Sequence, residues 1–185
     1  MVKVLPGTTI EISGLSKDIS RVMFDGIFAA GGITLSQVSV MTGLEPYMIQ
    51  NWVKRGFVSP PLKRQYTKDQ FARIVTLNML RESLQLDKIC EMLSYINGAL
   101  DDESDNLISD SELYHKYVDV VAEMKGSIIV EKEAIKGAVE RAATGYTEPI
   151  PGARKRLAKI LEVMTYAHFS TIARRSAEEI LSKLD

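Results

Sequence analysis

Residues 46–54 bring together side chains that can read nucleic acid. Tyr47, Gln50, Asn51 and Lys54 occur at i, i+3, i+4 and i+7, so on a helix they would share one face. Amides such as Gln and Asn can pair bidentately with adenine, Lys can reach phosphate or guanine, and Tyr can contact a phosphate or a thymine methyl. The spacing therefore favours a DNA-reading helix face, and an ordinary amphipathic surface helix is the alternative.

The neighbouring sequence predicts the elements that would position this face. A helix is expected over residues 35–42, opened by a capping box between Thr34 and Gln37 and ended by Gly43, which tolerates the left-handed turn. The reading helix should begin near Pro46, whose fixed φ suits the first helical position. Its other face, expected in the core, carries Ile49, Trp52 and Val53.

The segment after the reading helix is basic and too rich in proline for a helix. Residues 57–66 contain Pro60 and Pro61 and predict two brief strands around a tight turn. Within and beside this turn, Arg55, Lys63 and Arg64 are candidates for contacts with the DNA backbone. Further helices are expected from a second capping box at residues 67–70, and from Asp87 to residue 97.

Charge is unevenly distributed along a chain whose formal net charge is only −1. Residues 44–81 hold seven basic side chains against two acidic ones, whereas residues 87–112 hold eight acidic side chains against Lys88 alone. A basic segment in a neutral chain is typical of a local phosphate-binding surface, and an ordinary solvated face is the alternative. The acidic residues 99–110 predict an exposed linker.

The flanking regions have helical periodicity. Residues 16–30 place Ile19, Val22, Met23 and Ile27 on one face. Residues 111–143 and 153–183 predict further helices, with Gly126 as a break in the first and an apolar stripe from Leu157 to Ile180 in the second. A single small reader needs more area for specificity, so these C-terminal helices are expected to form a homodimer or to hold an effector.

The order and spacing of these residues resemble the MerR family of winged helix-turn-helix regulators. In that family the helix after the Gly turn is the recognition helix, and the Arg of an Arg-x-Tyr element in the wing contacts the DNA backbone. The resemblance gives Arg64 the wing role, places Tyr66 at the start of the next helix and adds it to the DNA-binding set. The matching segments are residues 33–38, Thr42-Gly43, residues 52–56, Pro60-Pro61, residues 64–66, residues 69–74, Leu80-Arg81, residues 86–89 and Leu93.

Two departures from the family pattern affect what can be carried over. Gln50 stands where the family usually has an Arg that contacts phosphate, so no operator preference follows from the resemblance. The long dimerising helix normally follows the fourth helix closely, whereas here the acidic residues intervene. The whole chain is similar to an uncharacterised bacterial family of MerR-like proteins with this Gln-Asn-Trp signature, an all-helical C-terminal part and no established ligand.

Other chemistry has less support in the sequence. Cys90 is the one cysteine and lies on an apolar face, which favours a structural thiol over a metal or redox sensor and a reducing, cytoplasmic setting. His115 and His168 have no ligand at metal-binding spacing, so they are expected to be solvated or partly buried. No phosphate loop, nucleophile elbow or paired-carboxylate pattern occurs, so no enzymatic activity and no cofactor are expected. The apolar runs are too short to span a membrane.

The sequence therefore predicts a mostly α-helical, MerR-like winged helix-turn-helix with a small β wing and a C-terminal helical region. The expected function is sequence-specific binding of double-stranded DNA by a homodimeric transcriptional regulator. A protein-interaction adaptor that kept the fold without operator binding is the alternative, and a small-molecule or protein effector at the C-terminal helices is compatible with both. The expected parts are residues 1–32, a lead-in and helix; 33–98, the winged helix-turn-helix; 99–110, the linker; and 111–185, the dimerisation or effector region.

Overall fold

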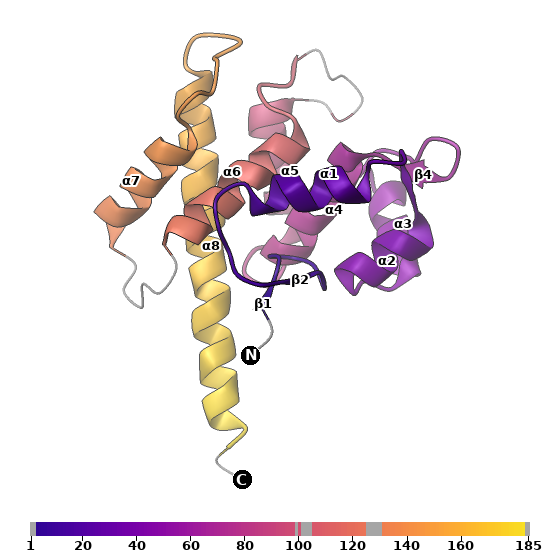
Figure 1. Cartoon of the computed structure of the whole chain (residues 1–185), viewed down its shortest axis with the longest axis horizontal. Coiled ribbons are helices and arrows are strands. Elements are labelled where there is room, and N and C mark those ends of the chain that lie inside the picture. The colour runs from indigo at the N-terminus through magenta and orange to yellow at the C-terminus, as the bar shows by residue number, and fades with distance from the viewer. Residues whose placement is uncertain (1–2, 99, 101–104, 125–130, 184–185) are drawn as a thin grey trace.

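The chain folds mainly into helices, as expected (Figure 1). The computed structural model describes residues 3–98, 100, 105–124 and 131–183. In these ranges β1 pairs with β2 and β3 with β4 in two small antiparallel sheets. The helices are α1 (Ile19–Ile27), α2 (Leu35–Thr42), α3 (Pro46–Lys54), α4 (Lys68–Leu80), α5 (Leu86–Asn97), α6 (Asp110–Glu123), α7 (Lys132–Ala142) and α8 (Ala153–Leu181), and the strands are β1 (Lys3–Val4), β2 (Glu11–Ile12), β3 (Ile33–Thr34) and β4 (Gln65–Tyr66).

The N-terminal segment packs on the core rather than leading loosely into it. The hairpin of β1 and β2 leaves Leu5 fully buried, and the Tyr114 hydroxyl of α6 donates to the Pro6 carbonyl at 2.7 Å. The predicted inner face of α1 is wrong at Val22, which is 66% exposed. Phe24 is buried instead, stacked on Tyr114 with ring centroids 5.3 Å apart, because an aromatic contact with α6 sets the rotation of this short helix.

Helices α2 and α3 form where the local signals predicted them. The Thr34 hydroxyl accepts from the Gln37 amide while the Gln37 side chain accepts from the Thr34 amide, so the expected capping box is present. Gly43 ends α2 with a φ of 69°, a conformation that costs glycine little. Pro46 occupies the first turn of α3 as predicted.

Residues 57–66 form less β-structure than the two strands expected there. In residues 57–66 only β4 is a strand, and it pairs with β3, which lies before α2, so that Ile33 faces Tyr66. The hairpin itself is reduced to a single bridge between Leu62 and Gln65 around a two-residue turn. The upstream residues Phe57 and Val58 are buried against the core instead of forming a strand.

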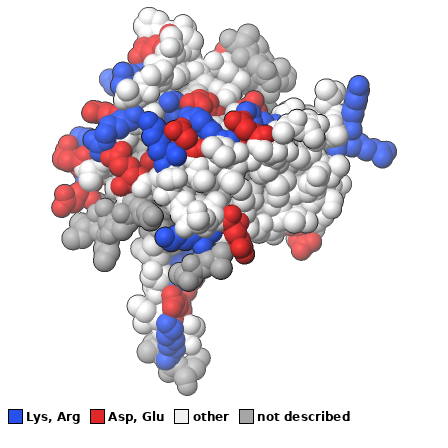
Figure 2. Space-filling view, viewed as in Figure 1, with Lys and Arg blue, Asp and Glu red and all other residues white. Residues whose placement is uncertain are grey.

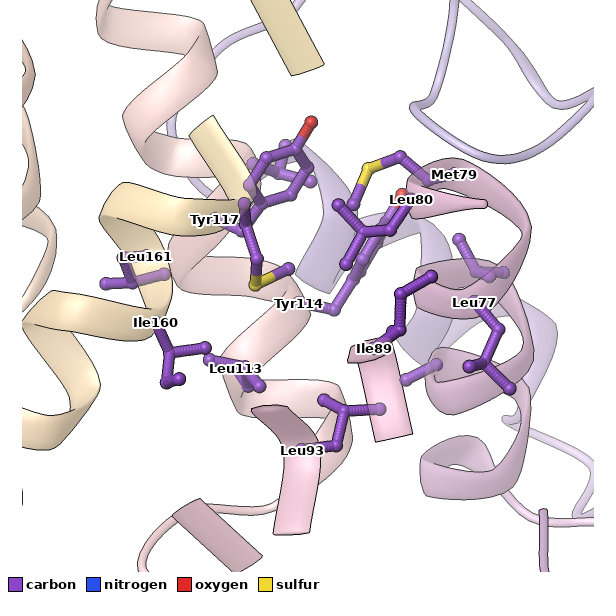
Figure 3. Close-up of a cluster of buried hydrophobic side chains, with 14 of the residues drawn as sticks. Leu77, Met79, Leu80, Ile89, Leu93, Leu113, Tyr114, Tyr117, Ile160 and Leu161 are labelled. Atoms are coloured by element: carbon purple, nitrogen blue, oxygen red, sulfur yellow. The ribbon is translucent and has the colours of Figure 1, made fainter. Parts of the chain in front are cut away.

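Helices from both halves of the chain share one hydrophobic core. Figure 3 shows side chains of α4 and α5 interdigitating with those of α6 and α8. Helix α4 is buried on most of its surface because α6 packs along it and α2, α5 and α8 also contact it. The side chains labelled in this cluster are Leu77, Met79, Leu80, Ile89, Leu93, Leu113, Tyr114, Tyr117, Ile160 and Leu161.

The expected exposed linker is wrong in its second half. Leu107 and Ile108 are 7% and 6% exposed, and the Leu107 amide donates to the Ile96 carbonyl at 3.2 Å. Asp110 opens α6 and forms an ion pair with Arg73 of α4, at 3.2 Å between Nη1 and Oδ2, with both side chains largely buried. Apolar burial and this ion pair dock the segment on α4 and α5. Gly126, expected to break the next helix, lies outside the described residues.

The last helix, α8, has two structurally different halves. Its first half lies on the core through Leu157, Leu161 and Met164, which are all fully buried. Its second half extends beyond the remaining helices (Figure 1), and here Ile172 and Ile180 are 46% and 65% exposed. The predicted apolar stripe thus leaves the core part-way along the helix. No helix in the described ranges combines the length and the apolar character needed to cross a membrane.

Candidate nucleic-acid interface

Helix α3 presents one apolar and one polar face. Ile49 and Trp52 are 0% and 2% exposed and hold the helix against the core. On the opposite side, Tyr47 is 68% exposed, and the remaining members of the predicted stripe, Gln50, Asn51 and Lys54, are exposed as well. The structure therefore brings these four side chains to the surface, on one stripe that runs along two turns of α3.

The anchoring of α3 fixes the direction in which this stripe points. The Trp52 ring lies under the guanidinium of Arg81, with the guanidinium carbon 5.9 Å from the ring centroid. The Trp52 carbonyl also accepts from the Phe57 amide at 2.9 Å, which ties the end of α3 to the start of residues 57–66. These contacts leave the stripe few alternative orientations.

The tight turn before β4 projects two basic side chains into solvent. Lys63 and Arg64 have φ values of 48° and 64°, so both central residues of the turn are left-handed, as in a type I′ hairpin turn. This conformation costs a residue with a Cβ atom on the order of 1 kcal/mol, yet glycine is absent here. Both side chains are exposed, and neither forms an ion pair with any described residue.

This turn and α3 lie at the same end of the molecule, away from α7 and α8 (Figure 1). Figure 2 shows basic side chains projecting from that end beside β4, whereas acidic and basic side chains are mixed over the opposite part of the visible face. The end of the molecule that carries the polar stripe of α3 thus also carries Lys63 and Arg64, whose charges are not paired with a carboxylate of the described residues.

The segment that leads into the turn is held by Gln70, which the sequence identified only as part of a capping box. Its Nε2 donates to the Pro60 carbonyl at 2.9 Å and to the Ser59 hydroxyl at 3.0 Å, while its Oε1 accepts from the Thr67 amide. Arg73 adds a hydrogen bond from Nε to the Phe57 carbonyl at 2.7 Å. One side-chain amide therefore both caps α4 and positions the segment before the turn.

Arg55, predicted to hold the DNA backbone, is partly engaged within the protein. Its guanidinium lies 4.3 Å from the Phe57 ring centroid, and Nη2 is 3.4 Å from Oδ1 of Asp87. Asp87 lies in the first turn of α5, whose N-cap residue is Gln85. The Arg55 side chain remains 45% exposed, so it is oriented by these contacts and still reachable.

Two residues that the sequence analysis placed at the surface are buried in the structure. Tyr66, included among the DNA-binding residues, is 2% exposed and lies in β4, before the N-cap of α4, so its side chain cannot contact DNA. Burial also raises the pKa of its phenol. Arg73, counted in the basic segment, is buried and paired with Asp110, and Lys68 forms a salt bridge with Asp25 at 3.1 Å. The basic surface is therefore smaller than the count along the sequence indicated.

The residues considered for other chemistry have structural contacts instead. Cys90 is half-buried, and burial raises the pKa of its thiol. His115 is buried with Nδ1 2.9 Å from the Ser20 hydroxyl, and the partly buried His168 has Nδ1 2.8 Å from the Tyr117 hydroxyl. Within the described ranges, no three acidic, histidine or cysteine side chains are grouped so that they could hold a metal ion.

Comparison with known protein families gives a match over residues 30–117. This span begins before β3 and ends within α6, so it includes the elements from β3 to α5 and the first part of α6. No curated protein and no solved structure matches the chain. Over residues 30–117 the chain is thus similar to a family described only as a domain of unknown function, DUF1836.

Proposed function

We propose that this protein is a transcriptional regulator that binds double-stranded DNA sequence-specifically through a MerR-type winged helix-turn-helix. The observation that carries the proposal is α3, anchored by buried Ile49 and Trp52 and exposing a stripe without aliphatic side chains. In this proposal the stripe lies in the major groove, where Gln50 and Asn51 read base edges. The remaining members of the proposed interface are Tyr47, Lys54, Arg55, Lys63 and Arg64.

The wing turn supports the same proposal. Two adjacent cations held in a strained conformation, with no acidic partner in the described chain, suit contacts with phosphates. Phosphate contacts set the register of a reader on the duplex and supply salt-dependent affinity, whereas the amides on α3 would supply sequence preference. The resemblance to MerR-type regulators assigns the same division of roles to these two elements.

We further propose that the protein acts as a homodimer through the exposed half of α8. Ile180 and Leu181 are each 65% exposed there, although they are large apolar side chains. A single reader of this size covers few base pairs, and a twofold pair would double the contacted area. The readers of such a dimer would bind an inverted repeat.

A protein-interaction adaptor that retains this fold is the second candidate. Gln50 replaces the arginine usual in MerR-type recognition helices, and the net charge of the chain is −1. Three of the basic side chains near the candidate interface, Arg55, Lys68 and Arg73, are already paired with carboxylates. These observations favour weak attraction to nucleic acid, and a direct test must separate the two candidates.

The test begins with a selection of fragments bound by the full chain from random double-stranded DNA. Recovery of an inverted repeat is the expected result. Affinities are then measured on the selected site and on random DNA at several salt concentrations. The four variants compared are Lys63→Ala, Arg64→Ala, Gln50→Ala and Asn51→Ala. Lys155→Ala, which removes an exposed cation from α8, serves as the control for net charge.

The two groups of variants should behave differently. Lys63→Ala and Arg64→Ala should weaken binding to all sequences alike and flatten the slope of log affinity against log salt by about 0.9 for each phosphate that is no longer neutralised. Gln50→Ala and Asn51→Ala should cost about 1–3 kcal/mol on the selected site and little on random DNA, with an unchanged salt slope. If none of the four folded variants differs from the wild type, or if no DNA is selected, the adaptor replaces this proposal.

A further inference from the structure

A cavity of about 560 Å³ lies beside α8, away from the stripe on α3. Its walls come from the N-terminal hairpin, the turn after α2, the C-terminal end of α4 and the part of α8 where that helix leaves the core. This volume is within the range of about 300–1,000 Å³ typical of small-molecule sites. The cavity is therefore large enough for a ligand, and it lies where distant parts of the chain converge.

Hydrogen bonds and ion pairs hold these walls together without a ligand. Asn78 Nδ2 donates to the carbonyls of Gly7 and Thr42, each at 3.0 Å, and so joins the hairpin and α2 to α4. On the other side, Glu82 accepts from Arg174 and Arg175 of α8 at 2.9 and 3.0 Å. A cavity fixed in this way is largely preformed, so binding would require little ordering.

The lining combines apolar surface with polar groups that retain hydrogen-bonding capacity. Leu15, Met79 and Ile172 contribute apolar side chains, and Ile172 is 46% exposed in the absence of a ligand. His168 uses Nδ1 for the Tyr117 hydroxyl, whereas its Nε2 has no hydrogen-bond partner among the described residues. An occupant should therefore present an apolar body and at least one polar group.

The charges at the cavity identify the sign of that polar group. Three cationic side chains line it, Lys3, Arg81 and Arg175, against the single carboxylate of Glu82. Arg81 uses Nε for the Asn78 side-chain oxygen, which leaves its terminal nitrogens free, and Arg175 binds Glu82 through Nε and Nη2, which leaves Nη1. The excess of unused cationic donors favours an anionic group on the ligand.

We propose that this cavity binds a small amphipathic anion, with its apolar body against Leu15, Met79 and Ile172 and its carboxylate or sulfonate at Arg81 and Arg175. This binding does not depend on the proposed DNA interface, since none of these side chains belongs to it.

The test measures binding of an aromatic sulfonate, 8-anilinonaphthalene-1-sulfonate, to the full chain by fluorescence in the absence of DNA. One saturable site per chain is expected, with displacement by decanoate and not by decyltrimethylammonium, which has an alkyl chain of nearly the same length and the opposite charge. Equal displacement by both competitors, or no saturable site, would overturn the proposal.

A matched pair of arginine variants locates the site. Arg174 and Arg175 both bind Glu82, but only Arg175 lines the cavity. Arg175→Gln should weaken sulfonate binding by about tenfold, as expected for loss of a charge-assisted hydrogen bond, and Arg174→Gln should leave it within about twofold. Equal losses in the two folded variants would place the probe elsewhere, on the exposed end of α8, and contradict the proposal.

A second pair keeps the test decisive if Arg175→Gln unfolds. Ile172→Trp should fill the cavity and abolish decanoate-sensitive binding, whereas Ala173→Trp adds the same ring to an exposed position that does not line the cavity. Thermal melts of both variants establish that they remain folded. Retained binding in folded Ile172→Trp would refute the site.

Discussion

Lowering the pH from 7 to 5 is expected to destabilise this protein through two histidines that are neutral in the folded state. His115 is 4% exposed, lies against Ser20 and packs edge-on to Phe24 with ring centroids 5.1 Å apart. Burial, reinforced by the positive charge of Arg21, lowers its pKa to about 4. Burial and the nearby Arg175 lower the pKa of His168 to about 4 as well.

The sign and size of the effect follow from these values. The unfolded chain binds a proton at each histidine near a pH of about 6.5, so the stabilising contribution is complete above that pH and is lost as the pH falls towards 4. At pH 5 the loss is about 2 kcal/mol for each histidine, or about 4 kcal/mol in all. Against a typical total of about 5–15 kcal/mol, this should lower the melting temperature by about 10 °C.

Urea unfolding at pH 7, 6 and 5 measures this dependence. The chain has only two histidines, so a double variant, His115→Asn with His168→Asn, contains none. Asp110 acts in the opposite direction, because burial raises the pKa of its carboxyl, and it is present in both proteins. The difference between the two pH profiles therefore isolates the histidines, and identical slopes between pH 7 and 5 would refute the reasoning.

Three further predictions concern the core ion pair, the thiol and the end of α8. Arg73→Met should lower the free energy of unfolding in urea by about 3–5 kcal/mol because it leaves the buried Asp110 carboxylate unpaired. Lys88→Met, which removes a partner from an exposed ion pair, should leave the free energy of unfolding almost unchanged. Equal losses in the two variants would contradict the role of the buried pair. Cys90→Ser should leave DNA affinity and its response to thiol reagents unchanged, and loss of that response with stability intact would identify a sensor. Ile180→Glu should convert a dimer to monomers of 20.6 kDa in sedimentation experiments, and a wild-type protein that is monomeric with and without DNA would exclude the dimer.

The sequence alone determined the elements whose signals are local. Each capping box lies within four consecutive residues, so Thr34 and Thr67 could be identified as helix starts without any knowledge of the fold. The two faces of α3 follow from helical periodicity, which is why the polar stripe was predicted in full. The reversal at Gly43 was likewise encoded in one residue that tolerates a positive φ.

The tertiary structure decided which of the remaining side chains reach solvent. Tyr66 and Arg73 look like surface residues in a basic segment, yet the packing of α6 along α4 and the pairing of β3 with β4 bury both. Leu107 lies in an acidic stretch without helical periodicity and is buried because the end of α5 accepts it. These outcomes depend on contacts between residues far apart in the chain, as does the cavity beside α8, and periodicity within one segment carries no information about such contacts.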